Sequence, residues 1–297
     1  HVGARVAAAN APEAARRALT LLPAHSGRSY HRDKEGGWWR CYLFVEKART
    51  YDVIEHPVQA KEAARAFGEF QHLLMDLPGP RLHETIPHFH HTRQRFNRLR
   101  EVIDANPQGR CQAAAADIAF ALEREPMVDR LLDLQARGVI PERITHNDTK
   151  LNNVMLDDAT GAGLCVIDLD TVMPGLALYD FGDMVRTATN SAAEDEADLS
   201  RIEARLPIFE ALVEGYLSAT GSFLTEPECA QLVFAGRLIT YEIGLRFLTD
   251  HLEGDIYFKT RRPGHNLDRA RNQFALLKRL EYHAVAMEAM VEHHLVK

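Results

Sequence analysis

The spacing of apolar residues changes near Pro57 and divides the chain into two regions. Before this point, short runs rich in aromatic and β-branched residues alternate with turns that contain glycine, a pattern typical of a small antiparallel sheet. These runs are Leu19–Pro23, Ser29–Arg32 and Trp38–Glu46. After it, apolar residues recur at every third or fourth position, which predicts helices. The first of these helices carries Ala60, Ala64, Phe67, Phe70 and Leu74 on one face.

The helical pattern continues to the end of the chain with one interruption. We expect further helices near residues 93–103, 110–137, 198–219, 225–249 and 266–294, and Asn266 is a suitable N-cap for the last one. The interruption is the block from Ile144 to Asp183. The predicted fold class is therefore α+β, with a small antiparallel sheet in residues 1–46 and a larger, mainly helical lobe in residues 47–297.

The non-helical block contains a predicted β-hairpin. Two short apolar runs, Val154–Leu156 and Leu164–Ile167, are joined by the turn-forming residues 157–163. Asn153 precedes the first run and Asp168 follows the second, so antiparallel pairing places their side chains at the same end of the hairpin. An amide oxygen and a carboxylate that leave the other positions to water and phosphate oxygens suit Mg²⁺. We expect Asn153 and Asp168 to hold that ion.

The loop before the hairpin carries a second group of chemically important residues. The order His146, Asp148, Lys150, Asn153, then a hairpin and Asp168, is the layout used for phosphoryl transfer in protein-kinase-like folds. In that layout Asp148 accepts or orients the proton of the attacking hydroxyl, and Lys150 stabilises charge on the transferred phosphoryl group. His146 is expected to order the loop by hydrogen bonding. Asp and Asn are also common turn residues, but turn propensity alone does not explain the complete set.

Two further aspartates in this block have less specific patterns. Asp170 is either a second metal or sugar contact or a structural hydrogen-bonding residue. Asp180 lies in an Asp-Phe-Gly string that follows the hairpin by too many residues to bind the metal. We expect Asp180 to brace the catalytic loop.

Three polar runs elsewhere are expected to be structural. Leu82–His91 holds four histidines, but it lacks HExxH spacing and Pro87 interrupts it, so a structured loop with partly exposed histidines is favoured over a zinc site. The acidic run Glu194–Asp198 is interpreted as a solvated helix start. The basic turn Arg261–His265 is interpreted as a surface loop, with phosphate contact as the alternative.

Four motifs identify a known superfamily. The chain resembles the aminoglycoside phosphotransferase and choline kinase superfamily of the protein-kinase-like fold, and within it the N-acetylhexosamine 1-kinases most closely. The motifs are HNDTKLNN (146–153), CVIDLDTVMPG (165–175), LYDFGD (178–183) and GLRFLTDHLEGDIYFK (244–259). The resemblance implies a bilobal fold, in which an amino-terminal lobe, apparently incomplete here, binds the nucleotide and the larger lobe with its catalytic hairpin binds the acceptor.

The resemblance also implies a reaction and roles for individual residues. The reaction is the ATP-dependent phosphorylation of the anomeric hydroxyl of N-acetylglucosamine or N-acetylgalactosamine. Asp148 is then the catalytic base, Asn153 and Asp168 are the metal ligands, and both aspartates are also substrate contacts. Arg246 and Tyr257 are implied to contact the sugar. The alternative for this pair is an arginine that lies along apolar surface and a core tyrosine.

The same resemblance places the adenine site. The strand that ends at Phe44, Val45 and Glu46 matches the strand that enters the hinge between the lobes. Its backbone is implied to hydrogen-bond adenine.

Other functions of the same fold remain open. An aminoglycoside, choline or another hexose is the first alternative acceptor, because the shape of the pocket decides the acceptor. A non-catalytic relative that binds a nucleotide or a sugar is the second alternative. The presence of Asp148, Asn153 and Asp168 together argues against it, because a binding module has no chemical need for all three. A metal-dependent phosphohydrolase is a weaker alternative still.

Charge and cysteine content exclude several other classes. The chain has 35 lysines and arginines against 42 aspartates and glutamates, and its net charge of −7 argues against a nucleic-acid partner. Its four cysteines are far apart and show no CxxC spacing, which disfavours a disulfide framework and a structural zinc site. No run approaches the ~18 apolar residues of a membrane span. We therefore expect a cytoplasmic protein whose partners are a nucleotide and a small-molecule sugar; oligomeric state leaves no signal in the sequence.

One expected element of a nucleotide site is not recognisable. Such a site normally has a glycine-rich loop and a strand lysine before the hinge. Neither is evident before Trp38, and Lys34 lies in a glycine-rich turn. We therefore expect a preceding segment of several dozen residues that carries both. A reading frame that began at His1 would instead encode a defective kinase without this loop and this lysine.

Overall fold

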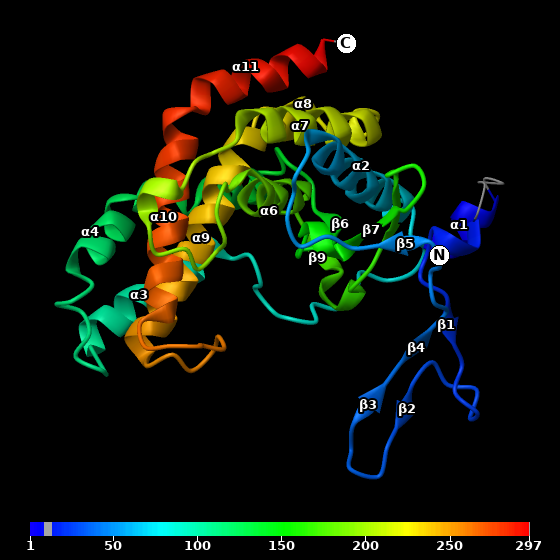
Figure 1. The fold of residues 1–297 in the computed structure, drawn as a ribbon, viewed down its shortest axis with the longest axis horizontal. Coiled ribbons are helices and arrows are strands. Elements are labelled where there is room, and N and C mark those ends of the chain that lie inside the picture. The colour runs from blue at the N-terminus through cyan, green and yellow to red at the C-terminus, as the bar shows by residue number, and fades with distance from the viewer. Residues whose placement is uncertain (9–13, 297) are drawn as a thin grey trace.

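The computed structural model describes residues 1–8 and 14–296, which form a small amino-terminal region of short strands and a larger helical region (Figure 1). The amino-terminal region consists of helix α1 (Val2–Ala8), the 3-10 turn η1 (Ala14–Arg16) and strands β1 (Leu21–Leu22), β2 (His31–Arg32), β3 (Trp38–Trp39) and β4 (Cys41–Tyr42). In Figure 1, β2 and β3 project away from the helices. The predicted α+β class, with a small sheet region and a larger helical lobe, is confirmed.

The amino-terminal strands pair antiparallel, as predicted, but they form two ladders and not one sheet. β1 pairs with β4, and β2 pairs with β3. The run that was expected to continue as a strand to Glu46 ends at Tyr42. After this ladder, the guanidinium of Arg16 binds the carbonyl oxygens of Glu46 and Lys47 at 3.0 and 2.9 Å. The carbonyl of Lys47 also accepts the backbone N–H of Asp158, directly after the strand Val154–Asp157, at 2.9 Å.

The predicted hairpin is confirmed and forms part of a three-stranded antiparallel sheet. Its strands are β5 (Ala48–Arg49), β7 (Val154–Asp157) and β8 (Gly163–Val166), in the order β5-β7-β8. Val154 lies opposite Val166, so the two ends of the hairpin meet as expected. A Cβ atom at Gly163 would lie 2.5 Å from the carbonyl oxygen of Glu62. This glycine therefore allows helix α2 to approach the sheet closely.

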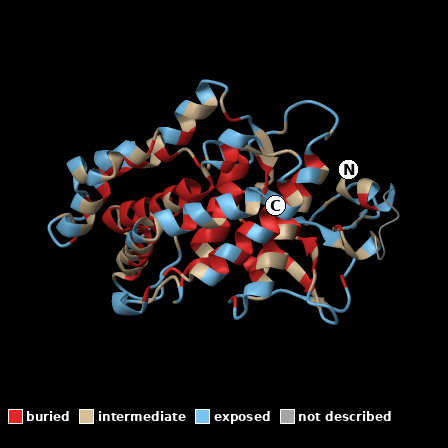
Figure 2. Cartoon of the chain, turned by 90° about the horizontal axis from the view of Figure 1, so that it is seen from above, coloured by how far each residue is buried: buried red, intermediate tan, exposed pale blue. Residues whose placement is uncertain are grey.

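The helical region is built around a buried helix, α6. Together with α6 (Ala177–Thr189), the core contains α2 (Pro57–Leu74), α7 (Leu206–Thr220), α9 (Leu232–Glu253) and α10 (His265–Tyr282). The outer helices are α3 (Thr92–Ala105), α4 (Ala115–Glu123), α5 (Arg130–Ala136), α8 (Glu226–Cys229) and α11 (Ala284–Leu295). Figure 2 shows the buried positions gathered in the middle of the molecule and the exposed ones on the outer helices. Almost every residue of α6 is buried, so polar groups on it need partners within the protein.

Short elements complete the region around the hairpin. Strand β6 (Arg143–Thr145) pairs with β9 (Met173–Gly175), and single 3-10 turns occur at η2 (Glu125–Met127), η3 (Leu151–Asn153), η4 (Leu169–Thr171) and η5 (Leu199–Arg201). The β6-β9 pair brings the chain before the catalytic loop beside the chain after the hairpin.

The predicted helices are present, but several are divided. Residues 110–137 form α4, η2 and α5, with Pro126 at the interruption, and residues 266–294 divide into α10 and α11 at His283. The helix expected from residue 198 starts at Leu206. Proline lacks the N–H that a helix interior requires, which explains the first interruption.

Two local predictions are wrong. Gly264 is the N-cap of α10, and the proposed cap Asn266 is buried inside the first turn, where its Nδ2 donates to Asp250 and Asp255 at 2.8 and 2.9 Å. The helix start expected at the acidic run Glu194–Asp198 is wrong for Glu194, Asp195 and Glu196, which lie in a loop, whereas Asp198 is the N-cap of a 3-10 turn (Leu199–Arg201) and accepts the N–H of Ser200 at 3.1 Å. The carboxylates of this loop bind side chains of other elements, including His265 of the basic turn. Among the described residues, no helix combines the length and the apolar character needed to cross a bilayer.

Helices α2 and α7 pack at very short range through two glycines. A Cβ atom at Gly68 would lie 2.9 Å from side-chain carbons of Ala219 and Thr220. A Cβ atom at Gly215 would overlap the backbone carbonyl of Lys61. The backbones of the two helices therefore touch where a larger residue has no space.

We predict that Gly215→Ala destabilises the protein by about 1–3 kcal/mol, because the added methyl group forces α2 and α7 apart. Helix propensity alone would give the opposite sign, a gain of up to about 1 kcal/mol. The free energy of unfolding from urea titration measures the difference. Glu210→Ala, at an exposed position of the same helix, is the control. A Gly215→Ala variant as stable as the wild type would contradict the packing argument.

Candidate active site

The catalytic loop is fixed to α6 by a buried carboxylate. Asp180 accepts the backbone N–H groups of His146 at 2.9 Å and Asn147 at 2.7 Å, and also the side-chain amide of Gln71 at 2.6 Å. Burial raises the pKa of Asp180, while these N–H donors act in the opposite direction. The prediction that Asp180 braces the loop is confirmed.

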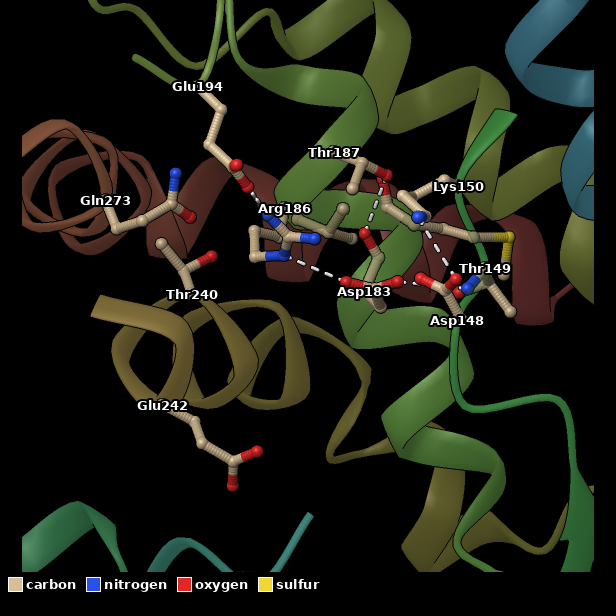
Figure 3. A network of polar contacts seen from close by, with 12 residues as sticks. Asp148, Thr149, Lys150, Asp183, Arg186, Thr187, Glu194, Thr240, Glu242 and Gln273 are labelled. Carbon is tan, nitrogen blue, oxygen red and sulfur yellow. Dashed lines mark hydrogen bonds and ion pairs between the residues drawn. The ribbon is translucent and has the colours of Figure 1, made fainter. Parts of the chain in front are cut away.

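A second carboxylate on α6 holds the loop on the other side of Asp148. Asp183 accepts the N–H of Thr149 at 2.9 Å and pairs with the buried guanidinium of Arg186 at 2.8 Å (Figure 3). Arg186 in turn contacts Glu194 at 2.9 Å. Burial tends to lower the pKa of Arg186, but the two carboxylates outweigh it and raise that pKa. Asp148 is therefore flanked by residues whose backbone N–H groups are bonded to α6.

His146 orders the loop, as expected. Its Nε2 lies 2.9 Å from the carbonyl oxygen of Ile167, and its Nδ1 accepts the N–H of Asp148 at 3.3 Å. Since Nδ1 accepts a hydrogen bond, Nε2 carries the proton and donates to Ile167. The ring is buried against the edges of Phe67 and Phe70. It joins the catalytic loop to the end of the hairpin.

Three of the predicted site residues meet at one carboxylate. Oδ2 of Asp148 lies 3.1 Å from Nζ of Lys150 and 3.1 Å from Nδ2 of Asn153, which also donates to the carbonyl oxygen of Asp148 at 2.8 Å. Both carboxylate contacts fall on Oδ2. Within the described part of the chain, no hydrogen bond is made to Oδ1, which remains able to accept a proton.

Asp168 lies at the end of the hairpin, next to the residue that bonds to Asn153. The N–H of Ile167 donates to the carbonyl oxygen of Asn153 at 2.9 Å, and Asp168 then adopts a left-handed conformation with φ 58°. Few non-glycine residues adopt this conformation. The Asp168 side chain is exposed and, among the described residues, has no hydrogen bond or ion pair. Asp170 instead pairs with Arg40, and its carbonyl oxygen accepts the hydroxyl of Thr85 at 2.9 Å.

These oxygens fit a magnesium ion that also binds phosphate. The side-chain oxygens of Asn153 and Asp168 are hard ligands without a hydrogen-bond donor in the described chain. In that part of the chain, no cluster of three or more His, Cys, Asp or Glu side chains could hold a metal. An ion at this pair would therefore take its other ligands from nucleotide phosphate and water.

The predicted adenine contacts lie apart from this group, in the segment between β4 and β5. Phe44 is 84% exposed, Val45 is buried and Glu46 is exposed. Arg16 binds the carbonyl oxygen of Glu46. The segment therefore has one free aromatic side chain and one carbonyl that is already hydrogen-bonded.

Arg246, on α9, and Tyr257, in the segment after α9, lie together in the helical region. Nη2 of Arg246 is 3.5 Å from the hydroxyl of Tyr257, and the guanidinium carbon is 5.4, 5.7 and 5.4 Å from the ring centres of Phe89, Tyr257 and Phe258. Tyr257 is 66% exposed, so it is not a core residue. These rings form a cation–π cage around the guanidinium. The cage borders a cavity of about 270 Å³ between α3, the end of α9 and residues 254–258.

The sequence interpretation missed a buried pair, His90 and Glu242, that links the cage around Arg246 to the catalytic loop. Residues 79–91 form the expected loop, but His90 is buried within it. Its Nδ1 lies 2.9 Å from Glu242 of α9 and its Nε2 lies 3.2 Å from the carbonyl oxygen of Asn147. Thr92 donates to the other oxygen of Glu242 at 2.5 Å. The only signal was a single glutamate in the apolar stretch of α9.

The environment of Glu242 makes its charged form stable. Burial would raise its pKa, but the hydrogen bonds from His90 and Thr92 and the positive charge of Arg246 outweigh burial and lower the pKa below its usual value. A carboxyl with a lowered pKa stabilises the folded state above its unfolded pKa, and this stabilisation is lost as the pH falls through the folded value.

We predict that Glu242→Gln lowers the free energy of unfolding by about 1–3 kcal/mol at pH 7. The difference from the wild type should shrink below about pH 4.5, the ordinary glutamate value. Urea titrations between pH 7 and pH 3.5 measure it. Glu214→Gln, which removes an exposed partner of Lys61, is the control and should change stability by less than about 1 kcal/mol at every pH. A difference that grew on acidification would contradict the assigned charge of Glu242.

Comparison with solved structures gives the same fold. The chain is similar to an aminoglycoside phosphotransferase from Alicyclobacillus acidocaldarius, with a TM-score of 0.57, 12% identity, and coverage of 98% of this chain and 82% of that one. A choline kinase from Cryptosporidium parvum gives a TM-score of 0.53 at 14% identity, covering 95% and 78% of the two chains. A spectinomycin phosphotransferase in complex with ADP and spectinomycin gives 0.50 at 11% identity, covering 94% and 81%.

The family follows from the sequence as well. Residues 5–219, which contain the braced catalytic loop and the hairpin, match the phosphotransferase enzyme family. This match covers more than half of the chain. The neighbours of the same fold include kinases of small molecules. The chain therefore belongs to the phosphotransferase enzyme family.

Proposed function

We propose that this protein is an ATP- and Mg²⁺-dependent kinase that phosphorylates the anomeric hydroxyl of N-acetylhexosamines. The observation that carries this proposal is the guanidinium of Arg246, which lies in a cage of aromatic rings. One of these rings belongs to Phe89, and the next residue, His90, lies 3.2 Å from the carbonyl oxygen of Asn147 in the catalytic loop. The cage favours a neutral sugar over a cationic acceptor. The motif that contains Arg246 and Tyr257 is also the one whose resemblance to N-acetylhexosamine 1-kinases is most specific.

Asp148 is the proposed catalytic base. Its Oδ2 is held by Lys150 and Asn153, and its Oδ1 faces no donor of the described chain. The 1-hydroxyl oxygen attacks the γ-phosphorus, the bond from that phosphorus to the ADP oxygen breaks, and the hydroxyl proton passes to Oδ1. An anomeric hydroxyl is more acidic than an ordinary alcohol, so an ordinary carboxylate suffices as the base. Positioning then supplies most of the rate.

Charge on the transferred phosphoryl group requires cations. Lys150 is half-buried next to Asp148 and is the side chain proposed to stabilise this charge. Bound Mg²⁺ would neutralise phosphate charge, and Asn153 and Asp168 are its proposed protein ligands. The backbone at Phe44, Val45 and Glu46 is proposed to contact adenine.

The cage separates the possible acceptors by charge. A quaternary ammonium such as choline binds in a cage of aromatic rings, but here the guanidinium of Arg246 already occupies it. Aminoglycosides carry several positive charges and would approach both Arg246 and Arg95, which also lines the cavity. A different neutral hexose meets neither obstacle and is the second candidate acceptor.

We predict that Asp148→Asn lowers kcat by about 10²–10⁴-fold, because the amide accepts no proton. The affinity for ADP should change by less than threefold, since Asp148 contacts only Lys150 and Asn153 among the proposed site residues. Isothermal titration with ADP and a coupled ADP-release assay measure the two quantities. Asp104→Asn, at an exposed position of α3, is the control. Near-native turnover of Asp148→Asn at saturating sugar and Mg-ATP would contradict the assignment.

We predict that N-acetylglucosamine or N-acetylgalactosamine stimulates ADP release at least tenfold more than choline or kanamycin. Glucose is included as the neutral alternative. The product should be labile to acid and stable to alkali, as expected of a phosphate at position 1. A higher rate with kanamycin or choline would reject the charge argument, and a lack of stimulation by every acceptor would reject the kinase proposal for this chain.

A further inference from the structure

The cavity beside Arg246 contains more positive than negative charge. It has a volume of about 270 Å³ and lies between α3, α9 and residues 254–258. Its charged lining residues are Arg95, Arg98, Arg246, Asp250 and Glu253. Three guanidinium groups therefore face two carboxylates.

Both carboxylates are already bound by other groups. Asp250 accepts the backbone N–H groups of Ile256, Tyr257 and Phe258 at 2.8 to 3.0 Å, and the side-chain amide of Asn266 at 2.8 Å. These bonds build the wall of the cavity. Glu253 forms an ion pair with Arg98. Within the described part of the chain, neither carboxylate forms an ion pair with Arg95 or Arg246.

Arg95 and Arg246 have no ion-pair partner among the residues that the structure describes. Nη2 of Arg95 donates to the carbonyl oxygen of Phe89 at 3.0 Å, while its Nε is buried and has no hydrogen-bond acceptor. Arg246 contacts the hydroxyl of Tyr257 and the aromatic faces, and it interacts through its charge with Glu242, which forms no ion pair with it because His90 and Thr92 bind that carboxylate. Burial and the charge of Arg246 lower the pKa of Arg95, while Glu242 and Tyr257 act in the opposite direction without offsetting them.

We propose that this cavity binds an anionic group, a carboxylate, sulfate or phosphate, through Arg95 and Arg246. The two guanidinium groups provide the planar donors that such groups bind best. The cavity volume accommodates a group of this size together with part of a sugar ring. The inference deepens the proposed function, because the acceptor is assigned to the same cavity. The anion is carried by the acceptor or is a free ion, and the experiment distinguishes the two sources.

The first arm tests the site with inorganic sulfate on the full chain. Sulfate is titrated at constant ionic strength with chloride, and saturating ADP is present so that sulfate does not report on a phosphate position of the nucleotide. The wild type should bind sulfate, and Arg95→Gln should weaken binding about 10–100-fold, as expected for loss of a hydrogen bond between charged groups. Isothermal titration measures the affinity, and the thermal midpoint measures folding.

Control variants separate this effect from general charge and from misfolding. Arg100→Gln removes the same charge from an exposed position of α3 that does not line the cavity, and it should bind sulfate like the wild type. Arg95→Lys keeps the charge but not the planar donors and should fall between wild type and Arg95→Gln. Equal sulfate affinity in wild type and a folded Arg95→Gln would overturn the proposal.

The second arm uses N-acetylglucosamine and its 3-, 4- and 6-sulfates as acceptors. If the acceptor carries the anion, one sulfated sugar should exceed the neutral sugar at least tenfold in kcat/KM, and Arg95→Gln should remove this preference. Sulfate binding without such a preference indicates a free anion and still supports the site. Absence of both effects overturns it. If no sugar is phosphorylated but sulfate binds through Arg95, the proposed function fails and the anion site stands.

Discussion

The position of the catalytic loop depends on one buried carboxylate, Asp180. A charged group in this position is unfavourable unless donors surround it, and three N–H groups from Gln71, His146 and Asn147 do so. Two of these donors belong to consecutive residues of the loop. Asn147 has a left-handed conformation with φ 65°, which non-glycine residues rarely adopt. The bonds to Asp180 therefore fix a backbone conformation that the chain would not adopt alone, and this conformation directs Asp148 toward Lys150 and Asn153.

Helix α6 is suited to this task because it is buried on all sides between α2, α7 and α9. A buried helix moves little relative to its neighbours, since close packing leaves no space for a shift. The glycines at the α2–α7 contact bring these neighbours together. Asp180 and Asp183 thus hold the backbone of residues 146–149 in a fixed position relative to the core. A catalytic group held in this way needs little reorganisation when substrates bind.

Local patterns in the sequence predicted most of this arrangement, and distant contacts were missed. The hairpin and the residues Asp148, Lys150 and Asn153 lie within a short stretch of sequence, so their spacing in the sequence was enough to predict that they lie close together. His90 and Glu242 are 152 residues apart, and only the packing of α9 against the loop before α3 joins them. Asn266 looked like a cap because it precedes an amphipathic helix, but its amide is bound by Asp250 and Asp255, which lie 16 and 11 residues earlier in the sequence. Contacts of this kind depend on the tertiary fold, which periodicity does not describe.

Two adjacent residues connect the proposed acceptor cavity with the loop that contains Asp148. Phe89 forms one face of the cage around Arg246 and provides the carbonyl that binds Arg95, whereas His90 binds Glu242 and the carbonyl of Asn147. Glu242 and Arg246 are one turn apart on α9. The wall opposite them is fixed by Asp250, whose oxygens are bound by the backbone of residues 256–258. The cavity is therefore formed before any ligand arrives, and a preformed cavity in which two guanidinium groups lack an ion-pair partner among the described residues would select its ligands first by charge and then by shape.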